Sequence, residues 1–165
     1  MAAVSERPQG ANPSDPTITP SRTCLTPSQH AFTIANNFLA AYRFCFSRQD
    51  YSLASFLLHQ AAERFYAAML LRVRASAPRT HNLEELGDQA AHLHRDLHAM
   101  LPRTEPEDRR LLSLLKSAYI KARYSRRYRI TPEDLSVLGA RVDGLGVLAK
   151  QVCEEGRGEP SSHAG

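Results

Sequence analysis

A short basic segment carries the residues best suited to chemistry in this sequence. Five cationic side chains fall within nine positions that contain no acidic residue: Lys121, Arg123, Arg126, Arg127 and Arg129. Tyrosines lie in or beside the same segment: Tyr119, Tyr124 and Tyr128. Arginine binds phosphate through paired N–H donors, and a tyrosine ring offers a face on which a base stacks. The segment therefore predicts a site for a nucleotide or RNA, with a solvated basic turn as the alternative.

The net charge of the chain is concentrated in this same segment. The 165 residues include 21 basic and 17 acidic side chains, which gives a formal charge of +4. Without the five cations of residues 121–129, 16 basic side chains remain against 17 acidic ones. A local excess of positive charge attracts phosphates and acidic surfaces. A further interpretation is therefore a structural bundle, for dimerisation or as a scaffold, whose basic turn binds an acidic protein partner.

A second polar group lies on a segment that is otherwise apolar. His59 and Glu63 are four residues apart in LLHQAAERFY, so a helix places them on one face, and Gln60 and Arg64 form a parallel pair. Buried polar groups need hydrogen-bond partners. We expect His59 and Glu63 either to contact a ligand between helices, or to make a satisfied polar contact within the bundle or at a dimer interface.

Metal and cofactor chemistry has little support in the sequence. His94 and His98 have a spacing that can share a metal, but no further ligand accompanies them, which favours a solvated face. The chain lacks the glycine-rich loops that hold nucleotide phosphates. Cys24, Cys45 and Cys153 form no C-x-x-C pair, which is typical of reduced thiols. We therefore expect no metal and no cofactor, so that side chains have to bind any nucleotide.

The elements that must position these residues are helices throughout, because apolar residues recur in steps of three and four. We expect five helices: from about Thr26 to Phe46, Tyr51 to Ala75, Leu83 to Met100, Thr104 to Ala122, and Thr131 to Val152. The second of these has only a narrow polar face and should lie at the centre of a helical bundle.

Both ends of the chain differ in composition from this helical region. Residues 1–26 contain four prolines among Ser, Thr, Gly and Asn, which predicts a disordered leader, and residues 156–165 are predicted to form a disordered tail. Residues 27–155 then form a single all-α domain. No window is apolar enough for a membrane helix and no secretory signal begins the chain, so we expect a cytoplasmic protein with no membrane contact.

Three blocks of the sequence, in this order and spacing, resemble a HEPN domain. They are FLLHQAAERFYAAMLL (56–71), THNLEEL (80–86) and LLSLLKSAYIKARYSRRYRIT (111–131), within a region from about residue 36 to 154. The ARY block is similar to the branch found beside small nucleotidyltransferase domains in prokaryotes and at the end of the chaperone sacsin. The resemblance implies an up-and-down four-helix bundle with an additional short helix. It also implies a homodimer that binds nucleotides or RNA, with a nucleotidyltransferase as protein partner.

Many HEPN proteins are metal-independent endoribonucleases, some of them of the toxin–antitoxin type, in which an Arg and a His separated by four to six residues form the site. In this chain Arg123 is followed after four residues by Tyr128 rather than by His. Tyrosine, with an ordinary pKa of about 10, is a poor general base at neutral pH. The resemblance therefore implies binding by Lys121, Arg123, Arg126 and Arg127, with Tyr124 and Tyr128 stacking. A variant ribonuclease site of Arg123 and Tyr128, joined by His59, is the alternative.

Overall fold

The computed structural model describes residues 25–155, and this part of the chain forms helices and connections without a strand. The helices are α1 (Pro27–Ser47), α2 (Tyr51–Val73), α3 (Leu83–Ala90), α4 (Leu97–Met100), α5 (Pro106–Tyr124) and α6 (Pro132–Glu155). The predicted all-α class is confirmed. Apart from Leu25 and Thr26, the predicted leader and tail, and with them Cys24, lie outside the described residues. From residue 25 to residue 155, no helix has both the length and the apolar character that crossing a membrane requires.

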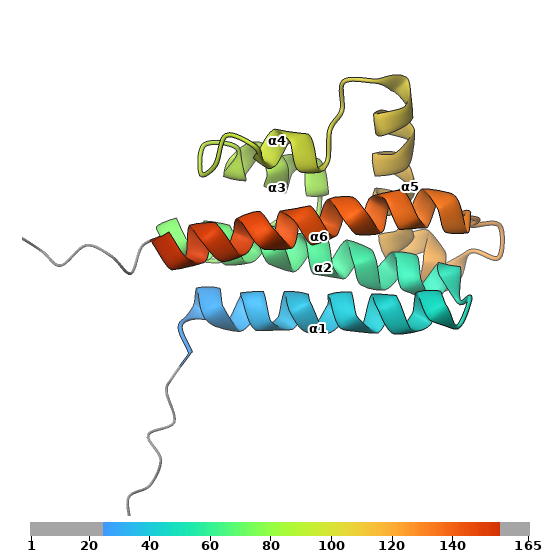
Figure 1. Ribbon diagram of the computed structural model, residues 1–165, viewed down its shortest axis with the longest axis horizontal. Helices are drawn as coiled ribbons and strands as arrows, with labels where there is room; N and C mark the ends of the chain where they lie inside the picture. Colours follow the sequence, from blue (N-terminus) through green and yellow to red (C-terminus); the bar gives the residue numbers. More distant parts are fainter. Residues whose placement is uncertain (1–24, 156–165) are drawn as a thin grey trace, which may run out of the picture.

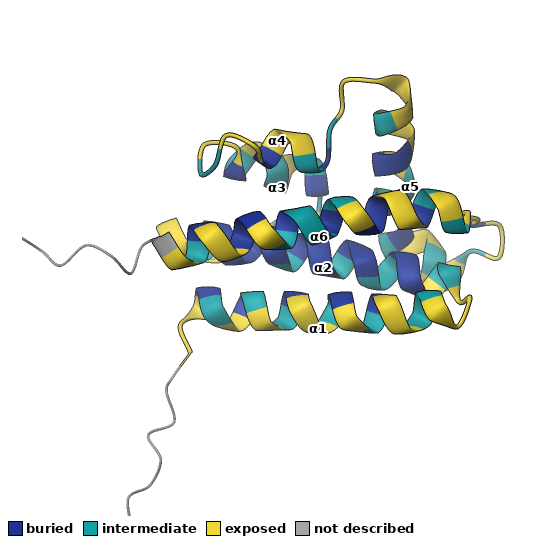
Figure 2. Cartoon of the chain, viewed as in Figure 1, coloured by how far each residue is buried: buried dark blue, intermediate teal, exposed yellow. Residues whose placement is uncertain are grey.

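Helix α2 is the central helix, as its apolar surface predicts. It packs against α1, α3, α5 and α6, and Figure 1 shows α1, α2 and α6 side by side with α5 standing across them. Its side chains are mostly buried (Figure 2), and Leu58 and Phe65 are completely so. Burial of one such side chain contributes about 1.5–3 kcal/mol. Because α2 is enclosed on most sides, a polar group on it has to find its partners within the bundle or in a ligand.

Helices α1 and α6 approach each other closely. Helix α1 begins at the predicted place, because the Thr26 hydroxyl accepts from the backbone N–H of Gln29 and the Gln29 side chain accepts from Thr26 N–H. Tyr42 of α1 donates its hydroxyl to the carbonyl oxygen of Leu135 in α6, at 3.1 Å. A Cβ at Gly139 would collide with the same hydroxyl. Glycine at position 139 therefore lets α6 lie against Tyr42.

The prediction of a single third helix from Leu83 to Met100 is wrong. Helix α3 ends at Ala90, and turns through residues 91–96 lead to the single turn of α4. Leu93 N–H donates to Ala90 and Leu97 N–H donates to His94, both across three residues, as in tight turns. Leu93 and Leu97 still reach the core, so the apolar spacing of a helix persists where the chain makes turns. Within residues 25–155 the bundle therefore has four long helices and two short ones, where the resemblance implies one additional short helix.

Helix α5 begins one residue later than predicted, because its N-cap is Glu105 where the sequence predicts Thr104. Pro106 occupies its first turn, where the fixed φ of proline favours a helix start. The carbonyl oxygen of Thr104 accepts instead from the guanidinium of Arg109, at 2.7 Å. At the start of α6, the Thr131 hydroxyl accepts from Asp134 N–H at 3.1 Å, in agreement with the sequence. The connection between α5 and α6 is therefore limited to residues 125–131.

Candidate functional site

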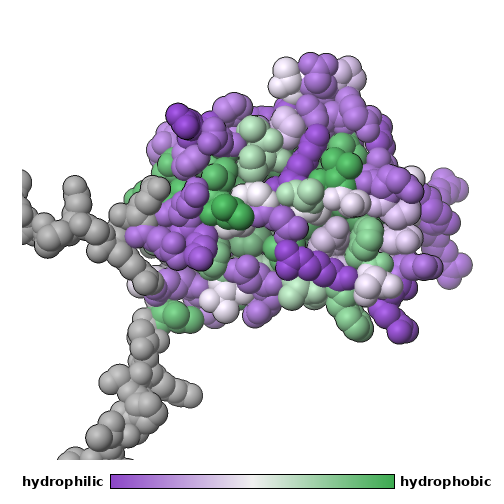
Figure 3. All heavy atoms as spheres, in the orientation of Figure 1, coloured by the Kyte–Doolittle hydropathy of each residue, from purple (hydrophilic) through white to green (hydrophobic). Residues whose placement is uncertain are grey.

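The basic segment spans the last turn of α5 and the connection to α6, so its cations project from a short, exposed stretch of chain. Lys121 and Arg123 lie in the last turn of α5, whereas Arg126, Arg127 and Arg129 lie in the connection, and all five are exposed. Within residues 25–155, none of them forms an ion pair with an acidic side chain. Figure 3 shows hydrophilic side chains gathered at this end of the molecule. The positive charge predicted from the sequence therefore stays available to a ligand.

Arg123 is held by a backbone carbonyl and three aromatic rings, and we call it, with Phe56, Tyr119 and Tyr124, the Arg123 site. Its Nε and Nη2 donate to the carbonyl oxygen of Tyr119 at 3.0 and 2.7 Å. Its Cζ lies 4.7 Å from the ring centre of Phe56 and 5.1 Å from those of Tyr119 and Tyr124. Among the described residues, no hydrogen bond uses Nη1, which keeps its two N–H donors. A guanidinium fixed in this way loses little entropy on binding phosphate.

Two histidines and a glutamate connect to this site through Tyr119. His81 donates its Nδ1–H to Glu63 Oε1 at 3.0 Å, and His59 Nε2 lies 3.7 Å from Glu63 Oε2. The His59 and His81 rings both pack on Tyr119, with ring centres 5.2 and 5.4 Å away, and the His81 ring is within 14° of parallel. The structure therefore places the predicted pair of α2 in the same group of contacts as Arg123 of α5.

The two histidines differ in their access to solvent. His59 is buried, and its Nδ1 lies 3.1 Å from the carbonyl oxygen of Leu115. Burial lowers the pKa of His59, against the opposing effects of the Leu115 hydrogen bond and of Glu63. A neutral His59 therefore links α2 to α5 within the bundle. The His81 side chain, by contrast, is 59% exposed and can meet a ligand.

One turn of α2 retains unused hydrogen-bonding capacity. In residues 25–155, the buried side-chain polar atoms without a hydrogen-bond partner are His59 Nε2, Gln60 Nε2, Glu63 Oε2 and Arg64 Nε. They belong to the two pairs that the sequence singles out by their spacing. A buried polar group without a partner costs about 1–3 kcal/mol, so such groups need an explanation. Two of the four atoms, on His59 and Glu63, belong to the group of contacts around Tyr119, which supports this part of α2 as a place where a ligand or a second chain acts.

Tyr124 and Tyr128 flank the arginines but lie in different surroundings. Tyr124 is 76% exposed, so its ring is open to stacking. Tyr128 is buried and donates its hydroxyl to the carbonyl oxygen of Leu114 at 3.3 Å. Burial also raises the pKa of Tyr128, which makes its phenolate scarcer at neutral pH and the side chain less suited to act as a general base. In this chain the ring of Tyr128 faces the bundle and Tyr124 offers the open face.

A second cationic site lies beside the connection, and we call it the serine hollow. It is lined by Leu114, Ser117, Lys121, Ser125, Arg127, Tyr128 and Arg129. Arg129 Nη1 donates to the carbonyl oxygens of Arg126 and Tyr128 at 2.7 and 2.9 Å, which holds its guanidinium in place. Its three cations are charged N–H donors of the kind from which a phosphate accepts hydrogen bonds, whereas the hydroxyl groups of Ser117 and Tyr128 already donate to the carbonyl oxygen of Leu114.

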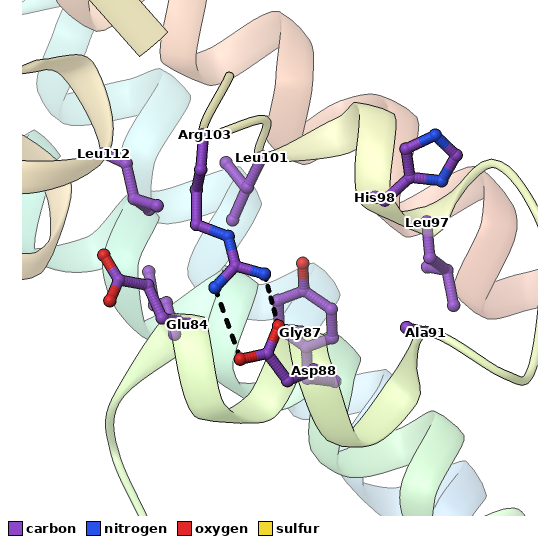
Figure 4. A pocket seen from close by; sticks show the side chains of 11 residues that line it. Glu84, Gly87, Asp88, Ala91, Leu97, His98, Leu101, Arg103 and Leu112 are labelled. Atoms are coloured by element: carbon purple, nitrogen blue, oxygen red, sulfur yellow. Dashed lines mark hydrogen bonds and ion pairs between the residues drawn. The ribbon is translucent and has the colours of Figure 1, made fainter. Parts of the chain in front are cut away.

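A separate hollow between α3, α4 and the start of α5 is occupied by contacts within the chain. Figure 4 shows Arg103 and Asp88 joined across it by two hydrogen bonds. The Arg103 guanidinium lowers the pKa of the Asp88 carboxyl group. Burial raises the pKa of Tyr66, which also lines the hollow, to about 12. Because these charges satisfy each other, the hollow stabilises the fold and offers no free cation to a ligand.

The histidines with metal-ligand spacing are not on one helix. His94 lies in the turn before α4, where its Nδ1 accepts from Asp96 N–H at 3.2 Å, and His98 lies in α4. Across residues 25–155, no group of three or more His, Cys, Asp or Glu side chains is arranged to hold a metal ion.

Sequence reasoning does not point to His81 as a member of the site. His81 lies in the connection between α2 and α3, and the way this connection folds back brings it onto Glu63 and Tyr119. Such a contact depends on the path of a loop, which apolar spacing does not specify. Two features of the sequence involve it: its position in the THNLEEL block, and its place after Arg74 with six residues between them, a spacing that chance also produces.

Comparison with known proteins adds the family of the chain. The family model of the HEPN domain matches residues 28–143, which is well over half of the chain and includes α2 and α5. Among solved structures, the crystal structure of TT1696 from Thermus thermophilus is similar, with 20% identity, a TM-score of 0.45, and coverage of 78% of this chain and 94% of that chain. A search of curated proteins finds no significant match. The chain therefore belongs to the HEPN domain family.

Proposed function

We propose that the chain is a nucleotide- or RNA-binding module that acts as a homodimer beside a nucleotidyltransferase. Phosphates bind to Lys121, Arg123, Arg126 and Arg127, and a base stacks on Tyr124. One observation carries this proposal: the cations of residues 121–129 have no acidic partner among the described residues, while Arg123 is already fixed against Tyr119. An unpaired guanidinium in a fixed position binds phosphate with a small loss of entropy. His59, Glu63 and Tyr128 support the site from within the bundle.

A charge-matched pair of variants tests the proposal. The triple variant Arg123/Arg126/Arg127→Ala should bind a fluorescein-labelled oligouridylate on the order of 100-fold more weakly, because it removes three cations that form charge-assisted hydrogen bonds with phosphate. The control Arg43/Arg95/Lys150→Ala removes the same charge from exposed positions outside both sites and should bind nearly as well as the wild type. Fluorescence anisotropy measures both affinities, and circular dichroism checks the fold. Equal affinity of the site variant and the wild type would show that the proposal is wrong.

The homodimer is supported by exposed apolar side chains near the Arg123 site. Leu53 of α2 and Ile120 of α5 are 43% and 60% exposed, although large apolar side chains gain free energy when a partner covers them. Size-exclusion chromatography with light scattering should find a dimer for the wild type and a monomer for Ile120→Glu. A wild-type monomer at micromolar concentration would contradict this part of the proposal.

The nucleotidyltransferase partner rests on the ARY block of residues 122–124. A neighbouring gene that encodes a nucleotidyltransferase, together with co-purification of the two products, would support it. Co-purification with some other acidic protein, combined with no affinity for nucleotide or RNA, would favour the scaffold interpretation of the basic segment instead.

A second candidate function is RNA cleavage without a metal, and the position of His81 favours it. Glu63 accepts the Nδ1–H of His81, which leaves Nε2 of an exposed imidazole as the acceptor that a general base needs. His81 is better suited to this role than Tyr128, which is buried and has a raised pKa. Labelled RNA in EDTA should then be cleaved by the wild type and remain intact with Arg123→Ala or His81→Ala. RNA that stays intact at high wild-type concentration would remove this candidate.

A further inference from the structure

The cations of the basic segment are divided between two sides of α5. Arg123 lies against Phe56 of α2, whereas Lys121 lines the serine hollow with Arg127 and Arg129. Residues two positions apart on an α-helix are separated by about 200° around its axis. Lys121 and Arg123 therefore leave α5 in nearly opposite directions, and the width of a helix, about 10–12 Å with its side chains, lies between the two sites.

Each of the two sites contains an arginine that is already fixed on backbone carbonyl oxygens. Arg123 is held by the carbonyl of Tyr119, and Arg129 by those of Arg126 and Tyr128. Both guanidinium groups are therefore prepared to receive a phosphate. A mononucleotide carries its phosphates as one group and fills one site, whereas a polynucleotide presents a phosphate at each nucleotide and can fill both.

We propose that the Arg123 site and the serine hollow bind phosphates of one single-stranded polynucleotide, which passes around the end of α5. This inference rests on the proposed phosphate binding at Arg123 and adds a second site and a class of ligand. The exposed rings of Tyr124 and His81 stack with bases that are not paired, which selects a single strand over a duplex. Occupation of two linked sites raises affinity, because the second contact forms at a high effective concentration.

The experiment measures affinities of the full chain for UMP, U10, dT10 and a U10·A10 duplex over a range of salt concentrations. Wild-type protein should bind U10 at least about 100-fold more tightly than UMP. The variants Arg123→Ala and Lys121/Arg127/Arg129→Ala should each weaken U10 binding about tenfold or more. Each should also reduce the slope of log K against log salt, by about 0.7 for every phosphate that the variant no longer neutralises. The control Arg43/Arg95/Lys150→Ala should retain both the affinity and the slope.

The outcomes separate this inference from the proposed function. If Lys121/Arg127/Arg129→Ala binds U10 with unchanged affinity and slope while Arg123→Ala does not, the inference is wrong, and the proposed phosphate binding at the Arg123 site stands without Lys121 and Arg127. If no probe binds to correctly folded wild-type protein, both are wrong. A duplex that binds as tightly as U10 would overturn the assignment of a single strand. The dT10 measurement then identifies the strand as RNA, when U10 is preferred, or as any single-stranded nucleic acid.

Discussion

The two ends of α5 carry arginines in different electrostatic surroundings. Near the N-terminal end, Arg110 donates to Glu107 and to Asp134 of α6, and Arg141 of α6 donates to Asp108, each at 2.6 Å. The Arg110–Asp134 and Arg141–Asp108 pairs join the start of α5 to the first half of α6.

Near the C-terminal end, no acidic side chain in the described part of the chain pairs with the cations of residues 121–129. Arg123 and Arg129 donate to backbone carbonyl oxygens instead.

The helix dipole accounts for this difference. Acidic residues are favoured in the first turn of a helix, where Glu107 and Asp108 lie, and cations are favoured in the last turn, where Lys121 and Arg123 lie. Arg110 and Arg141 are therefore neutralised by acids near this first turn, although Arg109 donates to backbone carbonyl oxygens instead. Cations at the last turn are tolerated without acids. Arg110 and Arg141 therefore contribute to stability at the N-terminal end of α5, which we call the paired end. The cations of residues 121–129 stay available for a ligand at the C-terminal end, which we call the open end.

The largest expected effect concerns the residue that supports the open end. Tyr128→Ala should lower the free energy of unfolding by about 3 kcal/mol, because it removes a buried aromatic ring from the connection that carries Arg126, Arg127 and Arg129. Tyr128→Phe keeps the ring and loses only the hydrogen bond to Leu114, so it should cost no more than about 1.5 kcal/mol. Urea denaturation followed by circular dichroism measures both values. A Tyr128→Ala variant as stable as the wild type would show that packing of the Tyr128 ring does not stabilise the open end.

A smaller effect separates the two ends directly. Arg141→Ala breaks a partly buried ion pair with Asp108 and should lower the free energy of unfolding by about 1–2 kcal/mol without changing the affinity for U10. Arg127→Ala, at the open end, should weaken U10 binding and change stability by less than about 0.5 kcal/mol. Urea denaturation and fluorescence anisotropy on the same samples measure both properties. The comparison fails if Arg127→Ala destabilises the protein as much as Arg141→Ala does.

Local features of the sequence predict the parts of the fold that depend on local physics. The apolar surface of α2 predicts its central place, and Thr26 with Pro27 predicts the start of α1. The break after Ala90 is not predicted, because Leu93 and Leu97 reach the core from turns with the spacing that a helix would give them. The spacing of apolar residues indicates which residues face the core, but it does not indicate which backbone hydrogen bonds form between them.

For the candidate site, too, the sequence predicts some features and not others. The clustering of cations is visible in the sequence, since it needs only neighbouring positions. The burial of Tyr128 and the contact of His81 with Glu63 are not visible, because both depend on the paths of connections between helices. Sequence reasoning therefore locates the charged segment, whereas the fold decides which of its aromatic neighbours can meet a ligand.

The smallest expected effect tests whether the open end binds phosphate in the absence of a nucleotide. A ligand that binds only the folded state stabilises it by RT ln(1 + [L]/Kd), which is about 1 kcal/mol at a concentration about four times Kd. For a domain of this size the melting temperature should then rise by about 4 °C in inorganic phosphate, relative to chloride at equal ionic strength. The rise should become smaller in Lys121/Arg127/Arg129→Ala, which keeps only the Arg123 site, and persist unchanged in Arg141→Ala, because the Arg141 guanidinium is already paired with Asp108. An equal rise in both variants would mean that phosphate acts on the protein as a general salt, and that the open end is no more available to anions than the paired one.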